Sequence, residues 1–156
     1  MKKQILIAIA GVFLTSNALM ASEPVPVTKV SDKVAKSFER SYKSVEDLKW
    51  YAEESDGHYI AVFKQEEILV KAKFDDKGKL LTSTRFYNEE TLPVEIREKV
   101  KKRFPDRTIF GVTEVTDAEK DEVVYYLKMQ CEKNWYTVKV SDGGSVSTVQ
   151  KYKKSA

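Results

Sequence analysis

The amino-acid sequence contains two similar stretches, and this internal repetition constrains the fold more than any other feature. Residues 68–82 align without a gap with residues 134–148. The alignment pairs Gly78 with Gly144, so the same turn residue stands at the same point of both stretches. Two copies are too few for a solenoid, which needs at least three repeats. The sequence therefore predicts one structural unit that occurs twice and closes on itself.

Each copy begins with a helical pattern. Val34, Phe38 and Tyr42 recur at every fourth residue, which gives a helix one apolar stripe. The same spacing occurs in the second copy at Ile96, Val100 and Phe104. We therefore expect one amphipathic helix at the start of each copy.

Alternating apolar residues predict four strands after each helix. In the first copy the strands are marked by Leu48/Trp50, Tyr59/Ala61/Phe63, Val70/Ala72/Phe74 and Leu80/Thr82. In the second copy they are marked by Phe110/Val112, Tyr125/Leu127/Met129, Tyr136/Val138/Val140 and Val146/Thr148. Asp75–Gly78 and Ser141–Gly144 are typical hairpin turns. The predicted fold is α+β: two tandem helix-plus-four-strand repeats, residues 31–88 and 91–152, form a curved antiparallel sheet with both helices on one face.

Two helices cover only one face of such a sheet, so we expect the other face to be open. Strict alternation assigns aromatic and basic side chains to that open face, and we interpret them as a partner-binding surface. The predicted binding residues are Tyr51, Lys71, Lys73, Arg85, Tyr87, Tyr126, Trp135 and Lys139. Ordinary cross-strand pairing is the alternative explanation for these residue types. A register slip of one residue would also exchange the two faces.

The N-terminus has the three zones of a cleavable secretory signal peptide. Lys2 and Lys3 precede the apolar run 5–14, and small residues follow around Ala18 and Ala21. The run is about half of the ~20 residues that a membrane-spanning helix needs. We therefore expect cleavage after Ala18 or Ala21, no stable membrane anchor, and a mature protein that is periplasmic or extracellular.

The charge of the mature chain is nearly balanced. Removing residues 1–21 takes away Lys2 and Lys3, so the 27 Lys and Arg become 25 against 24 Asp and Glu. This balance argues against a nucleic-acid partner, which would require a basic stripe. We expect a short N-terminal linker at 22–30 and a single domain at 31–156.

The sequence predicts no catalytic, cofactor or metal site, and hence no enzyme. His58 and Cys131 are the single members of their residue types, and together they form at most a distant nucleophile and base. Asp75 and Asp76 precede Gly78 as in a calcium loop, but lysines replace the other ligands, so a turn is the better interpretation. With one cysteine, an intramolecular disulfide is excluded; a partly buried thiol and an intermolecular disulfide remain.

The order of these motifs resembles that of the exported PepSY-like domains of Bacteroidota, which are grouped with the β-lactamase-inhibitory-protein-like fold. The residues that carry the resemblance are Phe38, Tyr42, 48–50, 59–63, 72–80 and Leu92–Pro93. The resemblance covers most of residues 30–152 and implies two tandem repeats in one curved sheet. In the namesake inhibitor the open concave face grips an enzyme. No stretch of this chain matches the inhibitory contacts, so the resemblance implies no binding residue.

These observations lead to a functional hypothesis and an alternative. The hypothesis is an exported, non-enzymatic binding module that acts on a protein or peptide through the open face of its sheet, by inhibition or sequestration. The alternative is an envelope structural or stress protein that acts by self-assembly. We expect a monomer or a weak dimer without a cofactor.

Overall fold

Both predicted helices are present in the computed structural model, which describes residues 23–53 and 55–155. Helix α1 spans Asp32–Ser41, and the Ser31 hydroxyl caps it by accepting a hydrogen bond from the Val34 backbone N–H at 3.4 Å. Helix α2 spans Val94–Arg103 and follows Pro93. Neither of these two helices, within the described residues, is long and apolar enough to cross a membrane. The predicted signal peptide, residues 1–21, lies outside the described residues.

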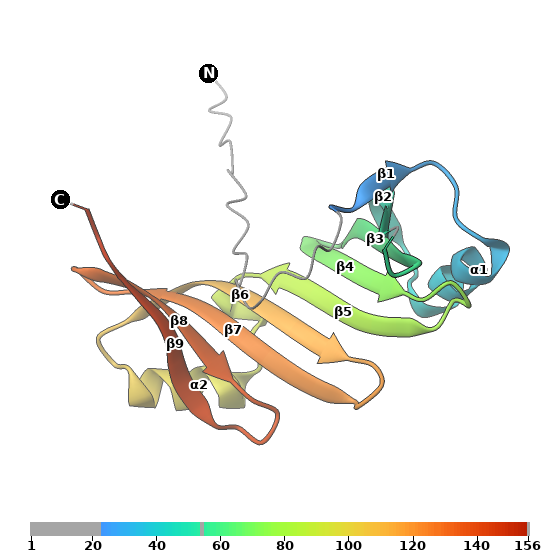
Figure 1. Cartoon of the computed structure of the whole chain (residues 1–156). Coiled ribbons are helices and arrows are strands. Elements are labelled where there is room, and N and C mark those ends of the chain that lie inside the picture. The colour runs from blue at the N-terminus through green and yellow to red at the C-terminus, as the bar shows by residue number, and fades with distance from the viewer. Residues whose placement is uncertain (1–22, 54, 156) are drawn as a thin grey trace.

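Nine antiparallel strands form one sheet in which each strand pairs with its neighbour in the chain, from β1 to β9 (Figure 1). The N-terminal half consists of α1 and strands β2–β5, and the C-terminal half consists of α2 and strands β6–β9, preceded by a short 3-10 helix at Glu89–Thr91. The strands are β2 Val45–Glu53, β3 His58–Gln65, β4 Ile68–Phe74, β5 Leu80–Tyr87, β6 Thr108–Asp117, β7 Glu122–Gln130, β8 Asn134–Val140 and β9 Val146–Lys153.

The ninth strand, β1, was not predicted. It spans Val25–Val27, inside the stretch that the sequence analysis treats as a linker, and pairs with residues 50–52 of β2. A strand of three residues has too little hydrophobic pattern to be predicted from the sequence. Its pairing depends on the otherwise unpaired backbone edge of β2. The short strand covers part of that edge.

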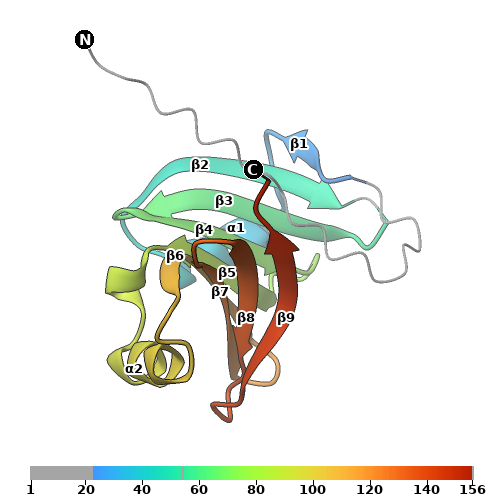
Figure 2. The ribbon, with the colours of Figure 1, turned by 90° about the vertical axis from the view of Figure 1, so that its left-hand side faces the viewer.

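Both helices pack on the same face of the sheet. Val34 and Phe38 of α1 lie in one buried cluster with residues of β3 and β4, whereas Val100 of α2 lies in a second cluster with residues of β6–β8. Ile68 packs against both clusters, so the core is continuous. Figure 1 shows α1 near the β2–β5 end and α2 near the β6–β9 end. Figure 2 shows the strands of the two ends crossing steeply, as expected for a twisted sheet. We call the face on which both helices pack the helix-covered face, and we call the opposite face the open face.

Four irregularities interrupt the regular alternation of side chains. The pairing shifts between Glu46 and Lys49 on β2, between Lys73 and Phe74 where β4 meets β5, between Ile109 and Gly111 on β6, and between Thr137 and Val138 where β8 meets β9. A β-bulge adds a residue to one strand, so every residue beyond it points to the opposite face from the one that strict alternation predicts. These bulges decide which side chains reach the open face.

Candidate partner-binding face

Six of the eight predicted binding residues lie on the open face. Trp50 packs under α1, so its neighbour Tyr51 points the other way and pairs with Ile60. Lys73 also pairs with Ile60 and therefore shares that face. The same reasoning places Lys71, Tyr126, Trp135 and Lys139 there, because each alternates with a buried residue of the core. Whether these residues bind a partner stays a prediction.

The predicted positions of Arg85 and Tyr87 were wrong. Arg85 pairs with Val70, which is buried under α1, so Arg85 points to the helix-covered face. Tyr87 is 8% exposed and belongs to the buried cluster under α2. The bulge after Leu80 is the cause, because it exchanges the faces for the rest of β5.

Arg85 and Tyr87 instead form a polar cluster with Glu114 where β5 meets β6, in which Tyr87 and Glu114 are buried and the Arg85 side chain is 38% exposed. The Tyr87 hydroxyl donates to Glu114 Oε2 at 2.5 Å, and Arg85 Nη1 donates to Glu114 Oε1 at 3.1 Å. Burial and the hydrogen bond to this carboxylate raise the pKa of Tyr87 far above its usual range. The cluster joins the two halves and satisfies a carboxylate that would otherwise be costly to bury.

On the N-terminal half of the open face, lysines stand between partly buried apolar side chains. Lys71 Nζ lies 5.8 Å from the centre of the Phe86 ring, and Phe86 pairs with Leu69 across β4 and β5. Lys73 Nζ lies 2.6 Å from Glu53 Oε2. Sequence analysis missed Phe86 because the bulge that turns Tyr87 inward turns Phe86 outward.

The most exposed aromatic side chains of the open face lie on its C-terminal half. Phe110 and Trp135 are 46% and 39% exposed, and their rings meet edge to face with centroids 5.1 Å apart. Tyr152 pairs with Trp135 across β8 and β9 and is 57% exposed. Lys154 Nζ lies 4.5 Å from the centre of the Trp135 ring. We call Phe110, Trp135, Tyr152 and Lys154 the aromatic patch.

Sequence analysis assigned Phe110 to the same face as Val112, and this was wrong. Val112 is buried, whereas Phe110 lies in the β6 bulge and contacts Trp135 on the open face. The next residue, Gly111, was an available signal, because a glycine inside a strand often marks a bulge. Leu48, which marks the first predicted strand of the N-terminal copy as Phe110 does in the C-terminal copy, also lies in a bulge and is 39% exposed.

A polar network of Lys128, Thr137 and Gln150 lies on the C-terminal half of the open face. Lys128 Nζ donates to Thr137 Oγ1 at 3.0 Å, and the Thr137 hydroxyl lies 3.0 Å from Gln150 Oε1. Partial burial lowers the pKa of Lys128. The hydrogen bonds of this network restrain its side chains next to the aromatic patch.

His58 and Cys131 are not brought together. Strands β4, β5 and β6 lie between His58 at the start of β3 and the β7–β8 turn that contains Cys131. Neighbouring strands are ~4.8 Å apart, so the two side chains are too distant to act as nucleophile and base. Cys131 Sγ lies 3.7 Å from the Tyr136 hydroxyl, and the backbone N–H of Lys133 is the main cause of its lowered pKa.

Comparison with solved structures identifies the fold. A BLIP-like protein from Bacteroides fragilis matches with a TM-score of 0.63 and 13% identity over 81% of this chain and 88% of that chain. This chain has the BLIP-like fold. A DUF2874 family protein from Bacteroides uniformis matches with a TM-score of 0.60, 13% identity, and coverage of 80% and 90%. A protein from Bacteroides eggerthii that is provisionally assigned to the periplasm matches with a TM-score of 0.60 and 13% identity, over 80% of this chain and 89% of that chain. No family model and no curated protein matches the sequence.

The predicted resemblance to the β-lactamase-inhibitory-protein-like fold is therefore confirmed at the level of the fold. The prediction of an α+β protein with an antiparallel sheet and two helices is also confirmed. At 13% identity the comparison carries information on architecture and none on the contacts of individual residues. The partner-binding interpretation rests on the chemistry of the open face.

Proposed function

We propose that this protein is an exported, non-enzymatic binding module that takes a protein or peptide partner on the open face of its sheet. The observation that carries the proposal is the aromatic patch: three large aromatic side chains, each at least 39% exposed, lie together on a face that neither α1 nor α2 covers. Apolar patches of this kind on otherwise polar surfaces favour protein contacts. The BLIP-like fold of the solved relatives is consistent with such a role.

The composition of the open face suggests the character of the partner. Tyrosine and tryptophan provide a large contact area at low entropic cost, and the surrounding lysines attract negative charge. Lys71, Lys128 and Lys139 lie on this face between the aromatic side chains. A partner segment that combines apolar and acidic side chains therefore fits this surface.

The sequence also supports export. Lys2, Lys3 and the apolar run 5–14 form a signal peptide pattern, and one structural relative is provisionally periplasmic. We further infer that the N-terminal and C-terminal halves are two copies of one unit, because both have one helix followed by four antiparallel strands.

Capture with matched variants tests the binding proposal. The mature chain is immobilised, periplasmic extract is passed over it, and the captured protein is identified by mass spectrometry. We expect a variant with Phe110→Ala, Trp135→Ala and Lys139→Glu to lose that protein. A control with Val94→Ala and Lys102→Glu changes an exposed apolar and a basic residue on α2, and should retain it.

The affinity of each variant for the captured protein then measures how much each substitution weakens binding. Trp135→Ala alone should weaken binding by about 30-fold or more, as expected for a central aromatic hot spot. Unchanged affinity of the triple variant, or loss of binding in the α2 control, would contradict the proposal.

One observation favours self-assembly as a second function. Strand β9 forms an edge of the sheet, with six of its eight residues exposed, so its backbone is available for pairing with another chain. Light scattering distinguishes the two functions. A concentration-dependent dimer supports assembly, and a monomer at all concentrations supports a separate partner.

A further inference from the structure

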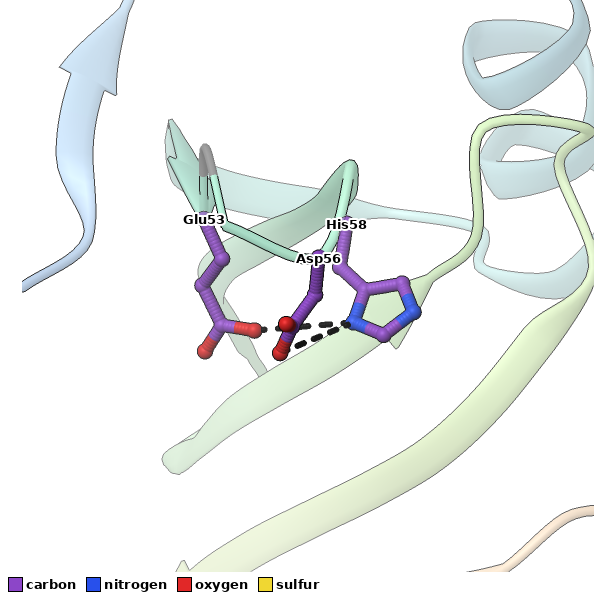
Figure 3. Close-up of side chains that lie close together, drawn as sticks. All are labelled: Glu53, Asp56 and His58. Atoms are coloured by element: carbon purple, nitrogen blue, oxygen red, sulfur yellow. Dashed lines mark ion pairs between the residues drawn. The ribbon is translucent and has the colours of Figure 1, made fainter. Parts of the chain in front are cut away.

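Three potential metal ligands meet at the turn between β2 and β3. Glu53 is the last residue of β2, His58 is the first residue of β3, and the two are paired across the hairpin. Asp56 lies in the turn between them. Figure 3 shows the three side chains directed toward one another, with both carboxylates facing the imidazole. The His58 Nδ1 atom lies 3.7 Å from Glu53 Oε2 and 3.9 Å from Asp56 Oδ2.

Two of these atoms are shielded from solvent without a hydrogen-bond partner. Within the described residues, His58 Nδ1 and Glu53 Oε2 are buried atoms without a hydrogen-bond partner. Their separation of 3.7 Å is too long for a hydrogen bond between them. Lys73 Nζ lies 2.6 Å from Glu53 Oε2, but this contact contributes charge without hydrogen-bond geometry. An unpartnered buried polar atom is unfavourable, so His58 Nδ1 calls for a group that binds it, and Glu53 Oε2 is close enough to bind the same group in place of Lys73.

We propose that Glu53, Asp56 and His58 bind a divalent transition-metal ion, with Zn²⁺ as the preferred ion. One ligand atom from each side chain lies within 4.8 Å of the others. Ligands about 2.1 Å from a tetrahedral Zn²⁺ are about 3.4 Å apart, so small side-chain rotations bring the three atoms into place. A water molecule completes the coordination. The imidazole favours zinc over magnesium or calcium, which prefer ligand sets made of oxygen alone.

Lys73 competes with the metal for Glu53. The ammonium neutralises the same carboxylate oxygen that the metal needs, and the lysine side chain is 29% exposed, so it can move away. Metal binding therefore releases Lys73 from its ion pair on the open face. This inference is independent of the proposed binding function, because the ligands and the aromatic patch lie on different strands. The ligands lie at the β2–β3 turn, whereas the patch lies on and next to β6, β8 and β9.

Calorimetric titration with Zn²⁺ tests the proposal on the mature, untagged chain. A Cys131→Ser background removes the thiol, which is the other strong zinc ligand in this sequence. We expect one saturable site per chain. His58→Gln and Glu53→Gln should each weaken binding by about tenfold or more. Asp117→Asn, which changes a carboxylate at the β6–β7 turn of the C-terminal half, is the matched control and should bind as the background does.

Two further measurements make the test decisive. Because His58 is the sole histidine, its imidazole signals in NMR spectra are unambiguous and should shift on addition of Zn²⁺. Lys73→Met should strengthen zinc binding by about threefold, since it removes the competing ammonium at a partly exposed site. Circular dichroism confirms that each variant is folded. Unshifted imidazole signals, equal affinity in His58→Gln, or calcium binding as tight as zinc would each overturn the proposal.

Discussion

The N-terminal and C-terminal halves have the same order of elements but differ in where they concentrate their aromatic rings. Under α1, the ring of Phe38 contacts those of Trp50, Phe63 and Phe74, with centroids 5.1 to 6.4 Å apart. Under α2, the cluster is mainly aliphatic, with members such as Leu127, Met129 and Val138. The exposed rings of the C-terminal half are those of the aromatic patch.

This difference separates the rings that stabilise the core from the rings of the proposed binding surface. Aromatic side chains bury large areas and contribute edge-to-face contacts, so the N-terminal half uses them as a core. The C-terminal half builds its core mainly from aliphatic residues, and its Phe110 and Trp135 remain on the open face. Two units with the same element order thus have different uses for the same residue type. The predictions below test this division, from the largest expected effect to the smallest.

The largest effect is expected from the aromatic core of the N-terminal half. Phe38→Ala should lower the free energy of unfolding by about 3–5 kcal/mol, because it removes a side chain that is 4% exposed and leaves a cavity among three rings. Val100→Ala, at the aligned position on α2, should lower it by about 2 kcal/mol. Urea denaturation measures both. Equal losses would show that the two cores are equivalent.

The two turn glycines should differ as well. Both have positive φ, but a Cβ at Gly78 would lie 2.6 Å from the backbone oxygen of Lys33, whereas one at Gly144 would meet the flexible end of Lys99. Gly78→Ala should therefore cost about 3 kcal/mol and Gly144→Ala about 1 kcal/mol of unfolding free energy. Thermal and urea unfolding provide the measurement. Gly143→Ala, with no atom within 4 Å of its Cβ, is the control.

Tyr87 tests the polar cluster that joins the halves. Its pKa is raised in the native state, chiefly by burial, whereas the unfolded phenol ionises near pH 10. Above pH 10 the unfolded chain therefore loses a proton that the native state keeps, and the unfolding free energy falls by up to about 1.4 kcal/mol per pH unit from this group. The stabilisation is fully present below pH 10.

Comparison with Tyr87→Phe isolates this effect. The variant retains Tyr42 and Tyr125, whose pKa values are also raised by burial, and so keeps their pH dependence. The stability advantage of the wild type, about 1–2 kcal/mol at pH 8 from the hydrogen bond to Glu114, should shrink between pH 10 and 11.5. Urea denaturation at several pH values measures it. Parallel pH profiles would contradict the raised pKa.

The smallest change in stability is expected from the aromatic patch. Phe110→Ala combined with Trp135→Ala should lower the free energy of unfolding by about 1 kcal/mol or less, because both side chains are exposed and lose mainly their contact with each other. Leu48→Ala, at a bulge of the N-terminal half, is the matched control. A loss comparable to that of Phe38→Ala would assign the patch to the core and remove the basis of the proposed function.

The sequence by itself determined the local elements. The stripes that include Phe38 and Val100 specify helices, and the turns at Gly78 and Gly144 specify hairpins, because both patterns depend on residues close in the chain. Alternation also placed Tyr51 and Trp135 on the open face correctly. The spacing of Glu53, Asp56 and His58 around a predicted turn was a usable signal for ligands on paired strands, but it was not recognised.

Only the tertiary structure decided the bulges, the pairing of β1 and the buried cluster around Glu114. A bulge arises from the fit of two strands to each other and to the helix above them, so the sequence of one strand does not specify it. The bulges moved Arg85 to the helix-covered face, Tyr87 into the interior and Phe110 out to the surface. The composition of the open face therefore depends on long-range packing, because a shift of one residue exchanges the two faces of a strand.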